Sequence, residues 1–97
     1  MYLCIVRRDA GVGFLGALTW APNMDNAQNK KFVIAYEAAF SRVPASYAMQ
    51  AYDAAALIDS AVRQVRGDVS NKDEVRAALK KSDFNSLRGR FRFNVNG

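Results

Sequence analysis

Residues 25–67 read DNAQNKKFVIAYEAAFSRVPASYAMQAYDAAALIDSAVRQVRG and decide the fold of this chain. Asp25 and Asn26 are good N-caps, and the apolar residues after them recur at three- and four-residue steps, so a helix is predicted to about Arg42. We expect its apolar stripe to be a core face, and the stripe consists of Phe32, Tyr36, Ala39, Phe40 and Val43.

Two further helices are predicted after the first. One begins at Pro44-Ala45-Ser46 and has Gly67 as its expected C′ residue. Its apolar side is rich in alanine, which allows another element to approach closely, and comprises Ala48, Ala51, Ala55, Ile58, Val62 and Val65. A short third helix starts at Ser70, which has capping-box spacing to Asp73, and ends near Lys81. Its apolar side is formed by Val75, Ala78 and Leu79.

Strands are predicted on both sides of the helices. The run from about Phe14 to Trp20 is apolar without a helical period, and residues 2–7 form a weaker candidate. Near the other end, Leu87 to Val95 alternates apolar residues with arginine and asparagine, which is typical of a half-buried strand. The following Asn96-Gly97 is a strong hairpin signal that demands a returning strand. We therefore expect either another chain on this edge or a longer parent fold.

Composition limits the chemistry that this chain can perform. Its 97 residues are 51% apolar and 24% charged, which suits one soluble globular domain. The chain has no histidine, and its lone Cys4 is expected to be a buried small hydrophobe, so no imidazole base, histidine metal ligand or internal disulfide is available. We expect no enzyme activity, no cofactor and no metal. The apolar start is too short for a signal peptide, and no run approaches the length of a membrane span.

An ordered set of short motifs resembles a known family. Its members are Thr19-Trp20-Ala21-Pro22, Asp25-Asn26, Asn29, Phe32, Tyr36, Pro44, Tyr47, Tyr52-Asp53-Ala54, Gly67-Asp68, Arg76-Ala77-Ala78-Leu79, Phe84, Gly89-Arg90-Phe91-Arg92-Phe93 and Asn96-Gly97. In order and spacing the set is similar to the late segment of type I periplasmic solute-binding proteins, which supply branched-chain amino acids, amides or aromatic acids to ABC transporters. It covers roughly residues 13–97, about the last quarter of a family member.

The resemblance implies an α/β fold of two lobes that close on a ligand like a hinge. Residues 1–97 would form a single partial domain: a fragment of one lobe, with three helices and flanking strands. The full-length parent would be a periplasmic receptor that delivers solutes to the membrane subunits of an ABC importer. We expect the isolated fragment not to bind solute, because a cleft between two lobes cannot be formed by part of one.

Two residues are candidates for ligand contact. The resemblance places Tyr47 against the solute, and an aromatic ring with a hydroxyl suits an amphiphilic ligand. Packing of Tyr47 in the core or at the helix start is an equal alternative. Gln50 could offer its amide to a carboxylate, although an exposed helix glutamine is the commoner case. Asp53 is interpreted as a structural hydrogen-bonding group, and three other aromatics, Trp20, Tyr36 and Tyr52, as core residues.

Two other classes of function deserve comparison with the receptor. The net charge of +5 and the arginines at positions 88, 90 and 92 suggest nucleic-acid binding. On a strand, however, the arginines and Phe91 and Phe93 would lie on opposite faces, whereas an RNA-binding sheet needs both on one face, so we expect no nucleic-acid partner. A small self-associating module is the other alternative, because unpaired strands could pair two copies into a homo-oligomer.

Overall fold

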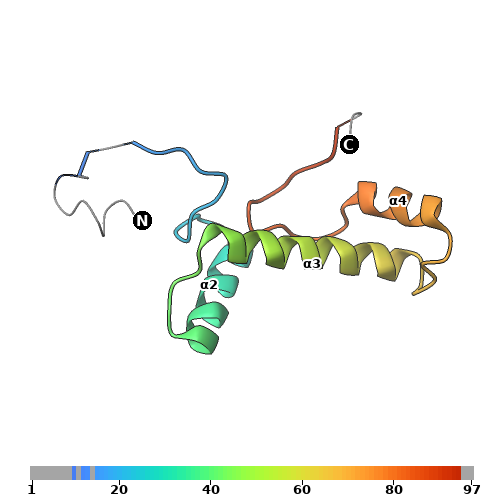
Figure 1. The fold of residues 1–97 in the computed structure, drawn as a ribbon, viewed down its shortest axis with the longest axis horizontal. Coiled ribbons are helices and arrows are strands. Elements are labelled where there is room, and N and C mark those ends of the chain that lie inside the picture. Colours follow the sequence, from blue (N-terminus) through green and yellow to red (C-terminus); the bar gives the residue numbers. More distant parts are fainter. Residues whose placement is uncertain (1–9, 11, 14, 95–97) are drawn as a thin grey trace.

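The computed structural model describes residues 10, 12–13 and 15–94. It contains three helices in this part of the chain, labelled α2 (Ala27–Phe40), α3 (Ser46–Gln64) and α4 (Lys72–Lys81). Figure 1 shows α3 as the long central helix, with α4 folded back beside its carboxyl end and α2 beneath its amino end. The number and order of the helices confirm the prediction.

Helix α2 begins directly after a residue whose side chain caps it. The Asn26 side chain accepts a hydrogen bond from the backbone N–H of Asn29 at 2.8 Å, so the predicted N-cap is confirmed. The expected core stripe is only half right. Phe32 is buried and Tyr36 half-buried, but Ala39, Phe40 and Val43 are exposed. In the described part of the chain, burial on α2 ends at Tyr36, because the neighbouring core contacts the helix only as far as that residue.

Helix α3 ends in a Schellman motif. Its C-cap is Val65, and the N–H of Gly67 donates to the carbonyl of Val62 at 2.9 Å while that of Arg66 donates to Arg63 at 3.1 Å. The C′ residue is therefore Arg66, with φ of 54°, and the prediction of Gly67 at that position is wrong by one residue. Gly67 also has a positive φ, 81°, so two consecutive left-handed residues reverse the chain toward α4.

Helix α4 is capped one residue later than predicted. The Asn71 side chain accepts from the N–H groups of Asp73 and Glu74, at 3.1 and 3.4 Å. Ser70 instead donates its hydroxyl to Asp68 at 2.6 Å, because it belongs to the turn before the helix. The predicted end at Lys81 is confirmed. So is the apolar side, in which Ala78 is buried and Val75 and Leu79 are half-buried.

The core lies on a face of α3 that the alanine pattern did not predict. Four large buried residues form it, namely Trp20, Phe32, Met49 and Leu87. On the predicted side of α3, Ala51, Ala55 and Ile58 are exposed. Ala48 does pack against the core, and Val62 and Val65 are half-buried. The rest of the predicted face is wrong, because Trp20 and Leu87 come from outside the helices and pack on the opposite side.

The predicted flanking strands are absent from the described residues. Neither 15–20 nor 87–94 forms a strand, because neither finds a backbone ladder within the described part of the chain. The alternation after Leu87 is also interrupted by Gly89, which has a φ of 95°. Residues 2–7, Phe14, Val95 and the Asn96-Gly97 signal lie outside the described residues. Among the helices described, none is long and apolar enough to cross a membrane.

Candidate functional site

A buried carboxylate fixes the carboxyl-terminal segment to α3. Asp53 accepts a hydrogen bond from the Ser86 hydroxyl at 2.5 Å and from the Leu87 N–H at 3.0 Å. Arg88 adds an ion pair, with its Nε 3.6 Å from Asp53 Oδ2. The Asn26 amide donates to the Leu87 carbonyl at 2.9 Å, which ties the start of α2 to the same segment. The interpretation of Asp53 as a structural hydrogen-bonding group is therefore confirmed.

A second buried polar side chain, that of Asn29, holds the turn that precedes α2. Asn29 has no exposed surface, and its Oδ1 accepts from the Trp20 indole N–H at 2.6 Å. Its Nδ2 lies within hydrogen-bonding distance of the carbonyls of Ala21, Pro22 and Met24. One asparagine therefore shapes the whole turn before the helix. Sequence reasoning noted Asn29 only as part of a motif, because helical periodicity carries no signal for a polar residue that is buried by its turn.

The predicted core aromatics separate into three degrees of burial. Trp20 is almost fully buried, which confirms it as a core residue. Tyr36 is half-buried and packs against the core cluster. Tyr52 contacts the Phe32 ring at a centroid distance of 4.9 Å, but half of its surface remains exposed. Tyr52 therefore lies at the edge of the core.

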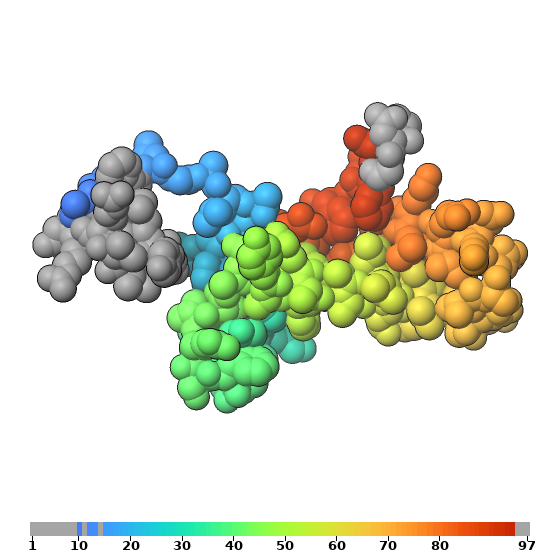
Figure 2. Space-filling view, viewed as in Figure 1, coloured from blue at the N-terminus to red at the C-terminus, as the bar shows by residue number. Residues whose placement is uncertain are grey.

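The Asp53 network shapes a hollow that we call the aromatic groove. It has a volume of about 500 Å³ and is lined by Thr19, Met49, Gln50, Asp53, Ala54, Leu57, Phe84, Arg88, Phe91 and Phe93. The rings of Phe84 and Phe93 contact Phe91 edge-on, at 5.5 and 5.8 Å between centroids. The Arg88 guanidinium lies 5.4 Å from the Phe91 centroid. In Figure 2 the segment that carries these aromatics lies along the upper edge of α3.

The two predicted contact residues have different surroundings. Gln50 is exposed on α3 and lines the aromatic groove. Tyr47 is 83% exposed at the start of α3 and is not among the groove residues. In the described part of the chain, then, Tyr47 does not pack in the core, and the structure does not bring these two side chains into one hollow.

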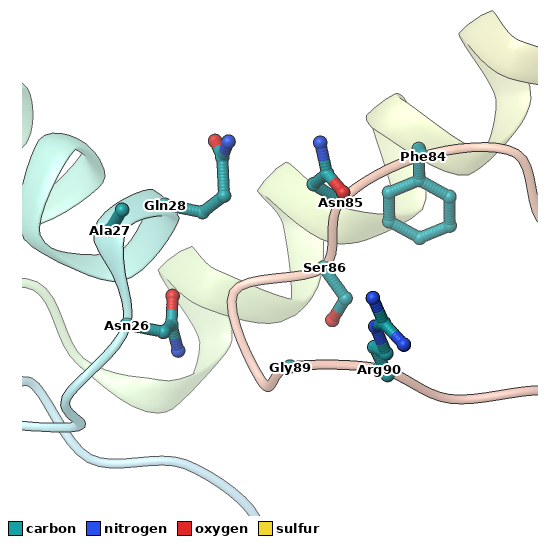
Figure 3. Close-up of a pocket in the computed structure, with 8 residues that line it drawn as sticks. All are labelled: Asn26, Ala27, Gln28, Phe84, Asn85, Ser86, Gly89 and Arg90. Atoms are coloured by element: carbon teal, nitrogen blue, oxygen red, sulfur yellow. The ribbon is translucent and has the colours of Figure 1, made fainter.

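Two further hollows lie outside the aromatic groove. A pocket of about 240 Å³ lies between the start of α2 and residues 84–90. Figure 3 shows Asn26, the capping residue before α2, with its side chain toward this segment, and Arg90 pointing up toward Ser86. A separate hollow of about 550 Å³ lies between the segment 18–23 and residues 43–46, which lead into α3.

Two carboxyl groups among the described residues have a lowered pKa. Asp25 and Asp68 are both exposed, and neither lines the aromatic groove. Hydrogen bonding and the charge of Lys30, 2.7 Å away, lower the pKa of Asp25. The hydroxyl and N–H of Ser70 lower the pKa of Asp68. Across the residues described, no group of three or more potential ligands could hold a metal ion. The groove offers aromatic faces, a guanidinium and an amide, which can stack and hydrogen-bond.

Comparison with known protein families identifies the class of protein to which this chain belongs. The family model described as Periplasmic binding protein matches residues 7–97, and the chain belongs to that family. The predicted resemblance is confirmed. Members of this class are solute-binding proteins found in the periplasm.

A solved structure gives a more particular likeness. It is described as an ABC transporter solute-binding protein from R. palustris in complex with benzoate, and it shares 35% sequence identity with this chain and a TM-score of 0.85. The likeness covers 96% of this chain and 26% of that chain, so the chain spans about a quarter of its structural neighbour. The helices therefore belong to a periplasmic-binding-protein fold. A search of curated proteins gave no match.

Proposed function

We propose that this chain is part of a periplasmic receptor that binds a small amphiphilic solute and delivers it to the membrane subunits of an ABC importer. The observation that supports this most is the likeness over 96% of the chain to a solute-binding protein that was crystallised with benzoate. We propose a binding role for the chain and no catalytic one, which agrees with the family and with the chemistry of the aromatic groove.

The proposed solute is a branched-chain amino acid, a related amide or an aromatic acid. The benzoate held by the R. palustris protein supports the aromatic member of this set. Such solutes combine an apolar body with a carboxylate or amide, and they are held by apolar side chains with a few well-placed polar groups.

Two residues of α3 are proposed to contact the solute. Tyr47 presents an exposed ring and hydroxyl at the start of the helix, where nothing in the described part of the chain covers it. Gln50 presents its amide one turn later, at the aromatic groove. A cleft needs a second wall, and the chain matches only 26% of the neighbour. We therefore propose that residues 1–97 are one partial domain that does not bind solute alone.

A chimera tests this proposal directly. Residues 13–97 would replace the matching segment of the R. palustris protein, and benzoate binding would be measured by calorimetry after circular dichroism has confirmed folding. We expect the chimera to bind benzoate. A folded chimera that has lost binding would contradict the proposed receptor role.

Variants of the chimera then test the two contacts. Tyr47→Ala and Gln50→Ala should each weaken binding by about 1 to 3 kcal/mol, the scale for losing a buried aromatic or a hydrogen bond. Phe40→Ala and Gln28→Ala are matched controls, because both residues are exposed on α2. An unchanged affinity in either α3 variant would remove that residue from the site.

A further inference from the structure

The aromatic groove contains two polar side chains that keep free hydrogen-bonding groups in the described part of the chain. The Arg88 guanidinium pairs with Asp53 through its Nε, at 3.6 Å, and its two terminal amino groups form no hydrogen bond with a described residue. Its side chain is 42% exposed. The Gln50 amide likewise has no partner among these residues. The groove therefore offers N–H donors to a ligand.

One acidic residue, Asp53, is found among the described residues that line the groove. It is only 5% exposed, and both of its carboxylate oxygens are already engaged within the chain. Its Oδ1 accepts from the Leu87 N–H, and its Oδ2 accepts from the Ser86 hydroxyl and faces the Arg88 Nε. A positive charge on a ligand would therefore find no free counter-ion in this part of the groove.

Three phenylalanine rings form much of the apolar part of the groove. Phe91 lies between Phe84 and Phe93 and contacts both rings edge-on. Phe91 and Phe93 remain 38% and 37% exposed. The Arg88 guanidinium lies 5.4 Å from the centroid of the Phe91 ring. Exposed aromatic surface and an available cation therefore lie within the length of one small aromatic molecule.

These features distinguish among the solutes proposed above. An aromatic acid brings a ring for the phenylalanine faces and a carboxylate for Arg88, whose planar fork can bind a carboxylate through two parallel hydrogen bonds. An amino acid also brings an ammonium group, which is costly to bury without a counter-ion. A neutral amide brings no charge to pair with the guanidinium. The groove therefore fits an aromatic carboxylate best.

We propose that Arg88 binds the carboxylate of the solute and that the groove selects aromatic carboxylates over amino acids and amides. The exposed faces of Phe91 and Phe93 contact the aromatic body, and the Gln50 amide supplies a further donor. This inference rests on the proposed receptor role. The groove is one wall of the cleft, and the rest of the parent fold supplies the other, since the chain matches 26% of its structural neighbour.

Substitution of Arg88 in the chimera tests the inference, with benzoate as the probe and calorimetry as the measurement. Arg88→Gln should raise the dissociation constant about ten- to a hundredfold, because a hydrogen-bonded ion pair with the ligand is lost. Arg88→Lys keeps a positive charge beside Asp53 but not the forked geometry, so it should retain part of the affinity. Equal losses in the two variants would contradict recognition by charge.

Arg90→Gln is the matched control. It removes the same charge two residues away, and Arg90 lines the pocket at the start of α2 and not the aromatic groove. Its affinity for benzoate should stay within about twofold of that of the unmodified chimera. A loss as large as that of Arg88→Gln would assign the effect to net charge and overturn the inference.

Benzamide separates recognition of the carboxylate from the shape of the groove, because it has the same ring and no charge. The unmodified chimera should bind benzoate more tightly than benzamide, and Arg88→Gln should reduce this ratio at least tenfold. An unchanged ratio would mean that Arg88 supports the groove without contacting the carboxylate, and it would overturn the inference.

The outcomes also separate this inference from the receptor role. An unmodified chimera that binds benzoate, with Arg88→Gln binding it equally well, would overturn the role of Arg88 and leave the receptor role intact. A folded, unmodified chimera that binds no benzoate would contradict the receptor role itself.

Discussion

The two ends of α3 are held by different kinds of interaction. At its amino half, Asp53 binds residues 86 and 87, which lie 33 and 34 positions away in the sequence, and buried side chains from both flanks complete the core. At its carboxyl end, α3 packs against the next helix through a short turn, and Gln64 donates to the Ala78 carbonyl only 14 positions away. The first end depends on buried polar groups, and the second on local helix pairing.

This difference shows where the fold is most vulnerable. A buried hydrogen-bonding group that loses its partner costs the full desolvation of that partner, whereas partly exposed groups can turn to water. Substitutions at the amino half of α3 should therefore lower the free energy of unfolding several times more than substitutions near α4. Four variants examine this comparison.

Trp20→Ala should have the largest effect. It removes a buried indole and leaves the Oδ1 of Asn29 without its 2.6 Å donor. We expect the free energy of unfolding to fall by about 3 to 5 kcal/mol, as for other buried aromatics. Urea denaturation followed by circular dichroism measures this loss. Trp20→Phe keeps much of the aromatic ring, so it should lower the free energy of unfolding by less. Equal losses of stability in the two variants would assign the effect to the indole N–H.

Asp53→Ala should cause the second largest loss of stability. It leaves the Ser86 hydroxyl and the Leu87 N–H without their acceptor in a buried place. A loss of about 2 to 4 kcal/mol is expected from two unsatisfied donors. Asp59→Ala, on the solvent side of the same helix, is the control and should cost about 0.5 kcal/mol or less. Similar losses at both positions would remove the distinction between the two kinds of aspartate.

Gln64→Ala tests the other end of the helix. The bond from Gln64 to Ala78 is 3.3 Å long and partly buried, so a loss of about 0.5 to 1.5 kcal/mol is expected. Amide hydrogen exchange should rise in α4, while the fluorescence of Trp20, the single tryptophan, stays unchanged. A changed tryptophan spectrum would show that the two ends are coupled.

Ser70→Ala should have the smallest effect. Its hydroxyl helps to lower the pKa of Asp68 below the ordinary value of 3.8, so the variant should raise that pKa. A carboxyl group whose pKa is lowered on folding stabilises the folded state above its ordinary pKa, and this contribution is lost as the pH falls through the lower, folded value. Carboxyl NMR titration measures the shift. An unchanged pKa in the variant would mean that the hydroxyl is not what lowers it.

Helical periodicity predicted the three helices, since Asn26 caps the first and Lys81 ends the last, where the pattern placed them. It did not identify the buried face of α3. That face is selected by Asp53, whose partners at residues 86 and 87 belong to no periodic pattern. The strands were predicted from local alternation, but a strand also requires a neighbour, and none lies within the described residues.

The site was predicted less completely than the fold. Tyr47 and Gln50 were chosen by resemblance, and of the two only Gln50 lines a hollow in the structure. The aromatic groove was not predicted, because Arg88 and Phe91 were assigned to opposite faces of a strand. Without that strand, the guanidinium approaches the Phe91 ring and both residues line one surface.

The hydrogen bond from Asn26 to the Leu87 carbonyl has a consequence for the order of folding. It joins residues 61 positions apart, so the chain must close a long loop before the bond can form. The α3–α4 hairpin needs only a short loop, and short loops close sooner. The hairpin should therefore form early, with Trp20 becoming buried in a later phase. Stopped-flow refolding would show this order as helix formation by circular dichroism that precedes the change in tryptophan emission, and simultaneous phases would contradict it.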